Sequence, residues 1–177
     1  MKKHFLLLSI LSLALMGTTS LSAQEYANEF RHNEIKLNLA GIFMPALELQ
    51  YDYIIREDMS VGADVSFSLG DAYPIAYQVT PNYRWFFGGN TTSSQKYGAG
   101  FFIEANLSAF GHRNSILINN QVEDQIETGV GLGAAVGWKY LSTGNWVGEI
   151  FIGAGKNFID DTFPIYPRGG LMIGYRF

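Results

Sequence analysis

IETGVGLGAAVGWKY, residues 126–140, is the stretch that decides the fold class of this chain. Its even-numbered positions carry no charge and are mostly apolar, from Ile126 to Tyr140. Its odd-numbered positions hold Glu127, Lys139 and four glycines. Alternation with a period of two is the pattern of a β-strand that presents one apolar and one polar face. The stretch therefore predicts a long strand.

The same alternation recurs in seven further segments, so the sequence predicts an all-β chain. These segments are residues 34–40, 46–53, 60–69, 76–87, 97–110, 146–154 and 168–177. In this register the apolar face carries no charge, and the opposite face holds eleven charged side chains. They are Lys36, Glu48, Asp52, Asp64, Arg84, Glu104, Glu127, Lys139, Glu149, Arg168 and Arg176.

Two architectures share such alternation, and the aromatic residues distinguish them. A soluble sandwich turns its apolar face inward, whereas a transmembrane barrel turns it toward lipid and its polar face toward the lumen. Ten aromatic residues fall at the strand ends that form one rim of an up-and-down meander. They are Tyr51, Tyr53, Trp85, Phe87, Tyr97, Trp138, Tyr140, Trp146, Tyr175 and Phe177. Such a rim is typical of the aromatic girdle at a membrane–water interface. We therefore predict an eight-stranded antiparallel up-and-down transmembrane β-barrel.

The connections predict which rim faces outward. The girdle rim has turns at residues 54–59, 88–96 and 142–145, and the other rim has connections at residues 41–45, 70–75, 111–125 and 157–167. Outer-membrane barrels have short periplasmic turns and longer outer loops. The two longest connections lie opposite the girdle, which we expect to be the periplasmic rim. Pro81 falls inside a predicted strand and removes a ladder hydrogen bond, so we expect either a β-bulge there or a local error in the predicted strand.

The N-terminus has the pattern of a secretory signal. Lys2 and Lys3 precede the apolar residues 5–16, and a cleavage site after Ala23 leaves residues 24–177 as one barrel domain. Without these two lysines the chain has ten basic and sixteen acidic side chains, which argues against nucleic acid as a partner. The remaining chain has no apolar run of the length that a membrane helix needs, and no cysteine for disulfides or thiolate metal sites.

The segment LMIGYRF, residues 171–177, resembles the C-terminal assembly signal of outer-membrane barrels, with Leu171, Ile173, Tyr175 and Phe177 at alternate positions. Together with the alternation, it makes the chain similar to the small eight-stranded barrels of the OmpA membrane-domain and OmpX class. Met172 departs from the glycine that is common at that position. The resemblance implies an outer-membrane location and recognition by the barrel-assembly machinery.

An eight-stranded barrel is just wide enough for side chains to fill its interior. We therefore expect the inward charges to pair with one another, and the barrel to be an anchor and not a porin. Gly129, Gly131, Gly133 and Gly137 share the inward face of one strand. We expect them to leave room for long side chains opposite, such as Arg84 or Arg176.

The sequence favours a non-enzymatic role, structural or surface-interacting, with membrane lipid around the barrel and a ligand or host partner at the outer loops. His112, Ser115 and Asp124 share one predicted loop, but their spacing matches no catalytic motif. Asp160 and Asp161 lack the spacing of a Ca²⁺ loop, and no cofactor or metal site is expected. Two alternatives remain: a lipid-modifying enzyme on the same fold, and a secreted lipocalin-like barrel that binds a ligand.

Overall fold

The computed structural model describes residues 31–42, 46–70, 73–87, 97–118, 121–159 and 163–177, with backbone alone at residues 42, 115–118 and 121–124. The predicted signal segment, residues 1–23, and the predicted cleavage site after it lie outside the described residues. No helix within the described ranges has the length and apolar character needed to cross a membrane.

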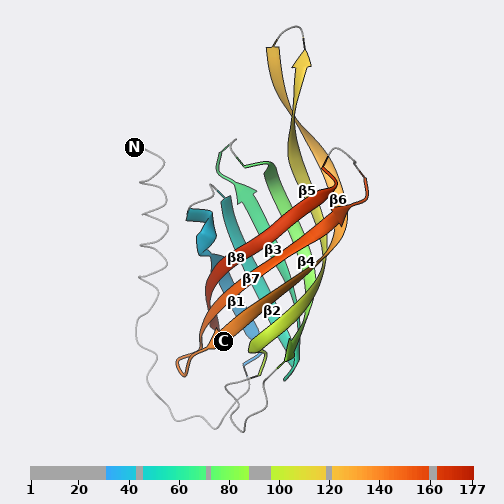
Figure 1. Ribbon diagram of the computed structural model, residues 1–177. Helices are drawn as coiled ribbons and strands as arrows, with labels where there is room; N and C mark the ends of the chain where they lie inside the picture. Colours follow the sequence, from blue (N-terminus) through green and yellow to red (C-terminus); the bar gives the residue numbers. More distant parts are fainter. Residues whose placement is uncertain (1–30, 43–45, 71–72, 88–96, 119–120, 160–162) are drawn as a thin grey trace, which may run out of the picture.

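Eight antiparallel strands follow one another around a closed barrel, as the alternation predicts (Figure 1). Each strand pairs with its neighbours in sequence, and β1 closes the barrel on β8, with Ile35 opposite Tyr175. The strands are β1 (Asn33–Asn38), β2 (Ala46–Arg56), β3 (Met59–Ser68), β4 (Ile75–Phe87), β5 (Gly100–Ile118), β6 (Gln121–Leu141), β7 (Trp146–Asn157) and β8 (Ile165–Arg176).

Burial alternates along the strands with the predicted register. In β4, Val79, Pro81 and Tyr83 are exposed, whereas Thr80 and Arg84 are buried. Because successive side chains of a strand point to opposite faces, one face of each strand lines the barrel interior and the other forms its outer wall. The outer wall is apolar, and the interior is rich in polar and charged groups.

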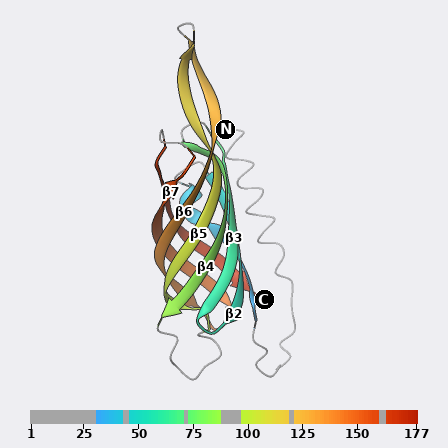
Figure 2. The ribbon, with the colours of Figure 1, turned by 90° about the vertical axis from the view of Figure 1, so that its right-hand side faces the viewer.

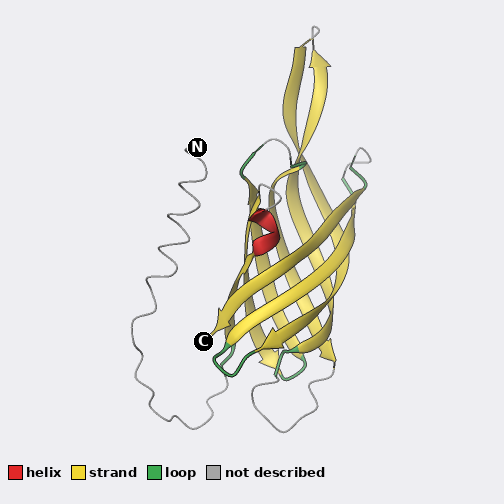
Figure 3. Ribbon diagram, turned by 60° about the vertical axis from the view of Figure 1, so that its left-hand side comes forward, coloured by secondary structure: helices red, strands yellow, loops and turns green. Residues whose placement is uncertain are grey.

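The strand that was expected to continue to Ala40 ends at Asn38, and a short 3-10 helix, η1 (Leu39–Ile42), follows it (Figure 3). Asn38 Oδ1 accepts a hydrogen bond from the Ala40 backbone N–H at 3.0 Å. An Asn side chain that bonds the backbone two residues ahead favours a turn over a continuing strand. The prediction was therefore two residues too long at this end.

The bulge expected at Pro81 is not there. Val79 pairs with Ala109 and Asn82 with Asn106, so the register of β4 against β5 is the same on both sides of the proline. Pro81 pairs with Ala63 of β3 and has no pairing on its β5 side. Because proline has no backbone N–H to donate, the pairing between β4 and β5 is interrupted at Pro81, but the register of the two strands does not change. The irregularity between β4 and β5 lies instead between Ile75 and Tyr77.

The connection predicted at residues 111–125 is wrong, because most of it is strand. β5 continues to Ile118 and β6 begins at Gln121, and the two pair from Gly111 opposite Thr128 to Ile118 opposite Gln121. The resulting hairpin rises above the other strands at the rim away from the C-terminus (Figures 1 and 2). On this side the barrel therefore carries a two-stranded projection.

The turn before β5 also differs from the prediction. Tyr97 was expected to begin the strand, but β5 starts at Gly100, after a turn in which Gly98 and Gly100 have φ angles of 57° and 98°. Glycine adopts positive φ without steric cost. These two glycines break the alternation, so Ala99 is buried instead of facing outward.

Candidate functional site

A network of charged side chains crosses the middle of the barrel. The Nζ atom of Lys36 lies 2.7 Å from Asp52 Oδ2 and 2.7 Å from Glu149 Oε2. The Nζ atom of Lys139 lies 2.8 Å from Glu34 Oε2 and 3.2 Å from the same Asp52 oxygen. These five side chains come from β1, β2, β6 and β7, so the contacts join strands that are not neighbours in the sheet.

Arg84 of β4 completes the centre of this network. Its Nη1 atom lies 3.0 Å from Asp52 Oδ2 and 3.0 Å from Glu149 Oε1, and its Nη2 atom lies 2.7 Å from Glu104 Oε2. The guanidinium carbon also lies 4.7 Å from the centre of the Phe102 ring. A planar, permanently charged guanidinium suits such a site because it donates in several directions at once.

Two further arginines extend the network toward the rims. Arg176 Nε donates to Glu34 Oε1 at 2.7 Å, and its Nη1 donates to a backbone carbonyl in the turn before β5 at 2.6 Å. Arg168 contacts the carboxylates of Asp64 and Glu104. The charges thus form one connected set along much of the lumen.

The central network is electrically balanced and dry. With Arg168 and Asp64 it contains five carboxylates and five cations, namely Glu34, Asp52, Asp64, Glu104, Glu149, Lys36, Arg84, Lys139, Arg168 and Arg176. The side chains of Lys36, Asp52, Arg84 and Glu149 are 0% exposed, which means that no water-sized sphere can touch them. These four side chains are therefore closed to solvent in the middle of the barrel.

The structure places all eleven predicted lumen charges on the inward face of their strands. Nine of them are buried, and Glu48 and Glu127, which lie toward the rim opposite the girdle, are half-buried. Sequence reasoning missed Glu34, which is fully buried and ion-paired. Its position two residues before Lys36 on the same strand is the signal that could have identified it.

Apolar side chains share the interior with the charges, which the alternation alone did not predict. One buried cluster consists of Phe86, Phe102, Ala135, Phe151 and Met172. Cations lie over its rings: Lys139 Nζ is 4.7 Å from the centre of Phe86, and Arg168 Cζ is 5.4 Å from that of Phe151. Such contacts stabilise a desolvated cation by about 2 kcal/mol. The rings therefore help to hold the charges inside the barrel.

A second apolar cluster lies nearer the rim from which the β5–β6 hairpin projects, which we call the hairpin rim. It consists of Ile75, Phe110 and Tyr166, with Tyr73 and Phe163 packed against it. The His112 ring stacks on Phe163 at 5.1 Å between centres, with 16° between the planes. This aromatic layer covers the lumen on the side of the long connections.

The inward glycines of β6 make room for aromatic rings and not for arginines. A Cβ at Gly129 would lie 2.5 Å from the Phe110 ring, and one at Gly137 would lie 2.5 Å from Phe102. At Gly131 it would lie 2.7 Å from the Tyr166 ring, and at Gly133 it would lie 2.9 Å from the Tyr166 hydroxyl. The expected partners Arg84 and Arg176 lie elsewhere. The glycines therefore fit the barrel wall against bulky interior rings.

This packing predicts the effect of adding a single methyl group. At Gly131 the new Cβ would lie 2.2 Å from the Lys156 backbone oxygen, so Gly131→Ala should destabilise the folded barrel by about 1–3 kcal/mol. A Cβ at Gly148 would meet no atom within 4 Å, so Gly148→Ala serves as the matched control and should be neutral. Urea unfolding of both variants in lipid vesicles measures the difference. Equal stabilities would contradict the described packing.

The three residues of the catalytic constellation considered from the sequence, His112, Ser115 and Asp124, all lie in the β5–β6 hairpin. Ser115 pairs with Asp124 across the hairpin, and His112 pairs with Glu127. The structure describes the backbone alone at Ser115 and Asp124, so the positions of their side chains lie outside the described part of the chain. His112 is 2% exposed, with its Nε2 atom 3.6 Å from Glu127 Oε2.

The described part of the chain shows no metal site. Asp160 and Asp161 lie outside the described residues. Within the described ranges, no three His, Cys, Asp or Glu side chains gather as a metal site would require.

The predicted girdle lies on the outer wall at the rim where β1 begins and β8 ends. Nine of its ten members are exposed aromatics, and Tyr97 is half-buried in the turn before β5. Several contact one another: the ring centres of Trp85 and Phe87 are 5.2 Å apart, and those of Trp146 and Tyr175 are 5.7 Å apart. Leu171, Ile173, Tyr175 and Phe177 also face outward. Their role as an assembly signal stays a prediction.

Comparisons with known proteins bear on the fold. No protein-family model matches the chain, and no curated protein matches it significantly. The N-terminal β-barrel domain of Pseudomonas aeruginosa OprF is similar in structure, with a TM-score of 0.56 and 16% identity over 83% of this chain and 98% of that chain. Neisserial surface protein A (NspA) aligns with a TM-score of 0.42 and 14% identity over 82% of this chain and 93% of that chain. The chain thus has the fold of a small eight-stranded outer-membrane barrel.

Proposed function

We propose that the protein is an integral outer-membrane barrel with a non-enzymatic role, structural or surface-interacting through the connections opposite the girdle. The observation that carries this proposal is the reversal of the usual distribution of side chains. Among the residues that the structure describes, thirty-one large hydrophobic side chains are exposed and eleven hydrophobic ones are buried, whereas the interior holds the charge network.

An aqueous environment does not suit this surface. Exposed apolar area costs about 25 cal/mol per Å², and soluble monomers seldom carry apolar patches beyond a few hundred Å². Here exposed apolar side chains surround the barrel, including Leu49, Val79, Leu107, Ile150 and Ile173. A lipid environment removes this cost. A lipocalin-like soluble barrel would instead need an apolar lumen, and the buried network at Arg84 disfavours that alternative.

The features at the two rims support one orientation of the barrel in the membrane. β1 begins and β8 ends at the girdle rim, where the backbones of Asn33 and Phe177 exchange hydrogen bonds at 3.1 and 2.8 Å. The hairpin of β5 and β6 projects from the opposite rim (Figure 1). Outer-membrane barrels keep short turns in the periplasm and send longer connections outward. We place the hairpin outside the cell, where it is available to a surface ligand or host partner.

The dry, balanced network supports an anchor and not a channel. An eight-stranded barrel is just wide enough to be filled by side chains, and here ion pairs and aromatic rings fill it. The spacing of His112, Ser115 and Asp124 matches no catalytic motif, which disfavours the alternative of a lipid-modifying enzyme with these residues as its catalytic groups. Outer-membrane lipid and the barrel-assembly machinery are the partners that this proposal requires.

Cell fractionation and gel mobility test the proposal together. Expressed with its own N-terminal segment in a Gram-negative host, the protein should fractionate with outer membranes. It should also migrate differently before and after boiling, because a closed barrel resists unfolding in detergent. Recovery in the soluble periplasmic fraction, with no heat-dependent shift, would contradict the proposal.

A further inference from the structure

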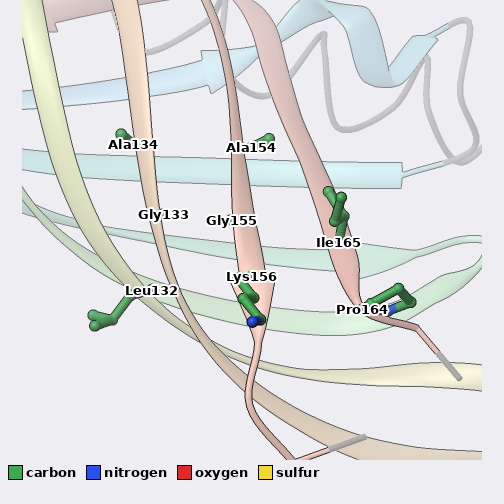
Figure 4. A pocket seen from close by; sticks show the side chains of 8 residues that line it. All are labelled: Leu132, Gly133, Ala134, Ala154, Gly155, Lys156, Pro164 and Ile165. Carbon is green, nitrogen blue, oxygen red and sulfur yellow. The ribbon is translucent and has the colours of Figure 1, made fainter. Parts of the chain in front are cut away.

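The outer wall has a hollow of about 690 Å³ over β6, β7 and the start of β8 (Figure 4). It is lined by Leu132, Gly133, Ala134, Ala154, Gly155, Lys156, Pro164 and Ile165. The hollow lies on the face that meets lipid under the proposed function, and the inference below rests on that proposal.

Strand register explains why the wall is hollow here. Ala134 pairs with Ala154, so two small side chains lie side by side on the outward face. One row nearer the hairpin rim, Leu132 pairs with Lys156, and Lys156 pairs with Ile165. One row nearer the girdle, Val136 pairs with Ile152. Larger side chains therefore bound the hollow above and below, and its floor is apolar.

Lys156 is the polar member of this hollow. It is exposed on the outward face of β7, between the exposed side chains of Leu132 and Ile165. Among the described residues no carboxylate lies within 4.0 Å of its Nζ atom, in contrast to the paired cations of the lumen. A cation facing the lipid side without a protein partner attracts an anion from the membrane.

The position of Lys156 along the barrel axis agrees with an anion of the membrane as its partner. Eight residues of β6 separate Tyr140 in the girdle from Leu132 beside Lys156. For a rise of about 3.3 Å per residue and a tilt of about 40°, this is about 20 Å along the barrel axis. The apolar band of such barrels is about 25 Å tall. Lys156 therefore lies near the far edge of the band, at the depth where headgroup phosphates begin.

We infer that this hollow binds a phospholipid with a net negative headgroup from the leaflet at the hairpin rim. The phosphate pairs with Lys156, and an acyl chain lies over Ala134 and Ala154 toward Ile152. Charge complementarity at one end and an apolar floor below it match the two parts of such a lipid. A second copy of the barrel fits less well, because two-fold packing through this face would bring two unpaired Lys156 side chains together in a low dielectric.

Native mass spectrometry of the purified, folded protein tests the inference. The protein in detergent is mixed with equal amounts of phosphatidylglycerol and phosphatidylcholine that carry the same acyl chains. The wild type should retain one phosphatidylglycerol in preference to phosphatidylcholine, since the anionic headgroup pairs with Lys156. Lys156→Gln should lose that preference. Ala154→Leu should lose retention of both lipids, because the larger side chain fills the hollow.

Two variants serve as matched controls. Ala63→Leu makes the same change on the outward face of β3, four strands away, and Arg56→Gln removes an exposed cation at the other rim. Both should bind lipid as the wild type does. The inference is overturned by equal headgroup preference in the wild type and Lys156→Gln, or by a dimer that Ala154→Leu dissociates. Either result in a protein that still shows the heat-dependent shift leaves the proposed function intact, whereas absence of the shift in the wild type contradicts the proposed function itself.

Discussion

Replacement of Arg84 by methionine should lower the free energy of unfolding by about 3–5 kcal/mol. Arg84 donates to Asp52, Glu104 and Glu149, and its side chain is 0% exposed. Removing one partner of a buried ion pair leaves the others charged without compensation, which costs more than the pair itself contributes. Urea unfolding in lipid vesicles, followed by tryptophan fluorescence, measures the loss.

Two further variants distinguish the effect of breaking the charge network from the effect of losing one positive charge. Arg56→Met removes an exposed arginine at the end of β2 and should change stability by less than about 0.5 kcal/mol. Arg84→Lys keeps the charge but cannot make all the same hydrogen bonds, so its stability should be intermediate. If Arg84→Met and Arg56→Met were equally stable, the lumen charges would not hold the barrel together as described.

Ala105→Arg should destabilise the barrel by about 2–4 kcal/mol, which is the cost of an arginine facing lipid near the midplane. Ala105 is exposed on the outward face of β5 and pairs with Tyr83 and Ala134 at mid-height of the wall. Urea unfolding in vesicles again measures the change.

The same-site variant Ala105→Leu is the control for this substitution. It keeps an apolar side chain toward lipid and should leave stability within about 0.5 kcal/mol of the wild type. Equal tolerance of arginine and leucine at this site would mean that the outward face of β5 meets water.

The fold could be predicted from the sequence because every transmembrane strand obeys one simple rule. Residues two positions apart share an environment. The eight segments with one uncharged face, residues 126–140 among them, therefore predicted the number of strands and which face of each strand points inward. The hairpin was not predicted because Ile116, Leu117 and Ile118 are three apolar residues in a row, which hides the alternation. Under the proposed function the hairpin lies beyond the membrane, where no lipid selects an apolar face and alternation is not required.

The interior could be predicted only in part. Charged residues are rare on the outward face, where Lys156 near the end of β7 is an exception, so most charged residues in a strand point inward, as Arg84 and Glu149 do. An aromatic residue is permitted on either face. Phe86 and Phe102 each stand beside another aromatic in the sequence, and alternation requires that one member of each pair face inward. Such pairs, with the glycines opposite them, were the available signal for the buried rings.

The central claim is that the outer wall meets lipid, and the tryptophans test it most directly. The chain has three, Trp85, Trp138 and Trp146, and each is about half exposed on the girdle. In vesicles, lipids brominated near the headgroup should quench their fluorescence strongly, lipids brominated at the chain ends less, and aqueous iodide weakly. Strong quenching by iodide, with none by brominated lipid of either kind, would contradict the account.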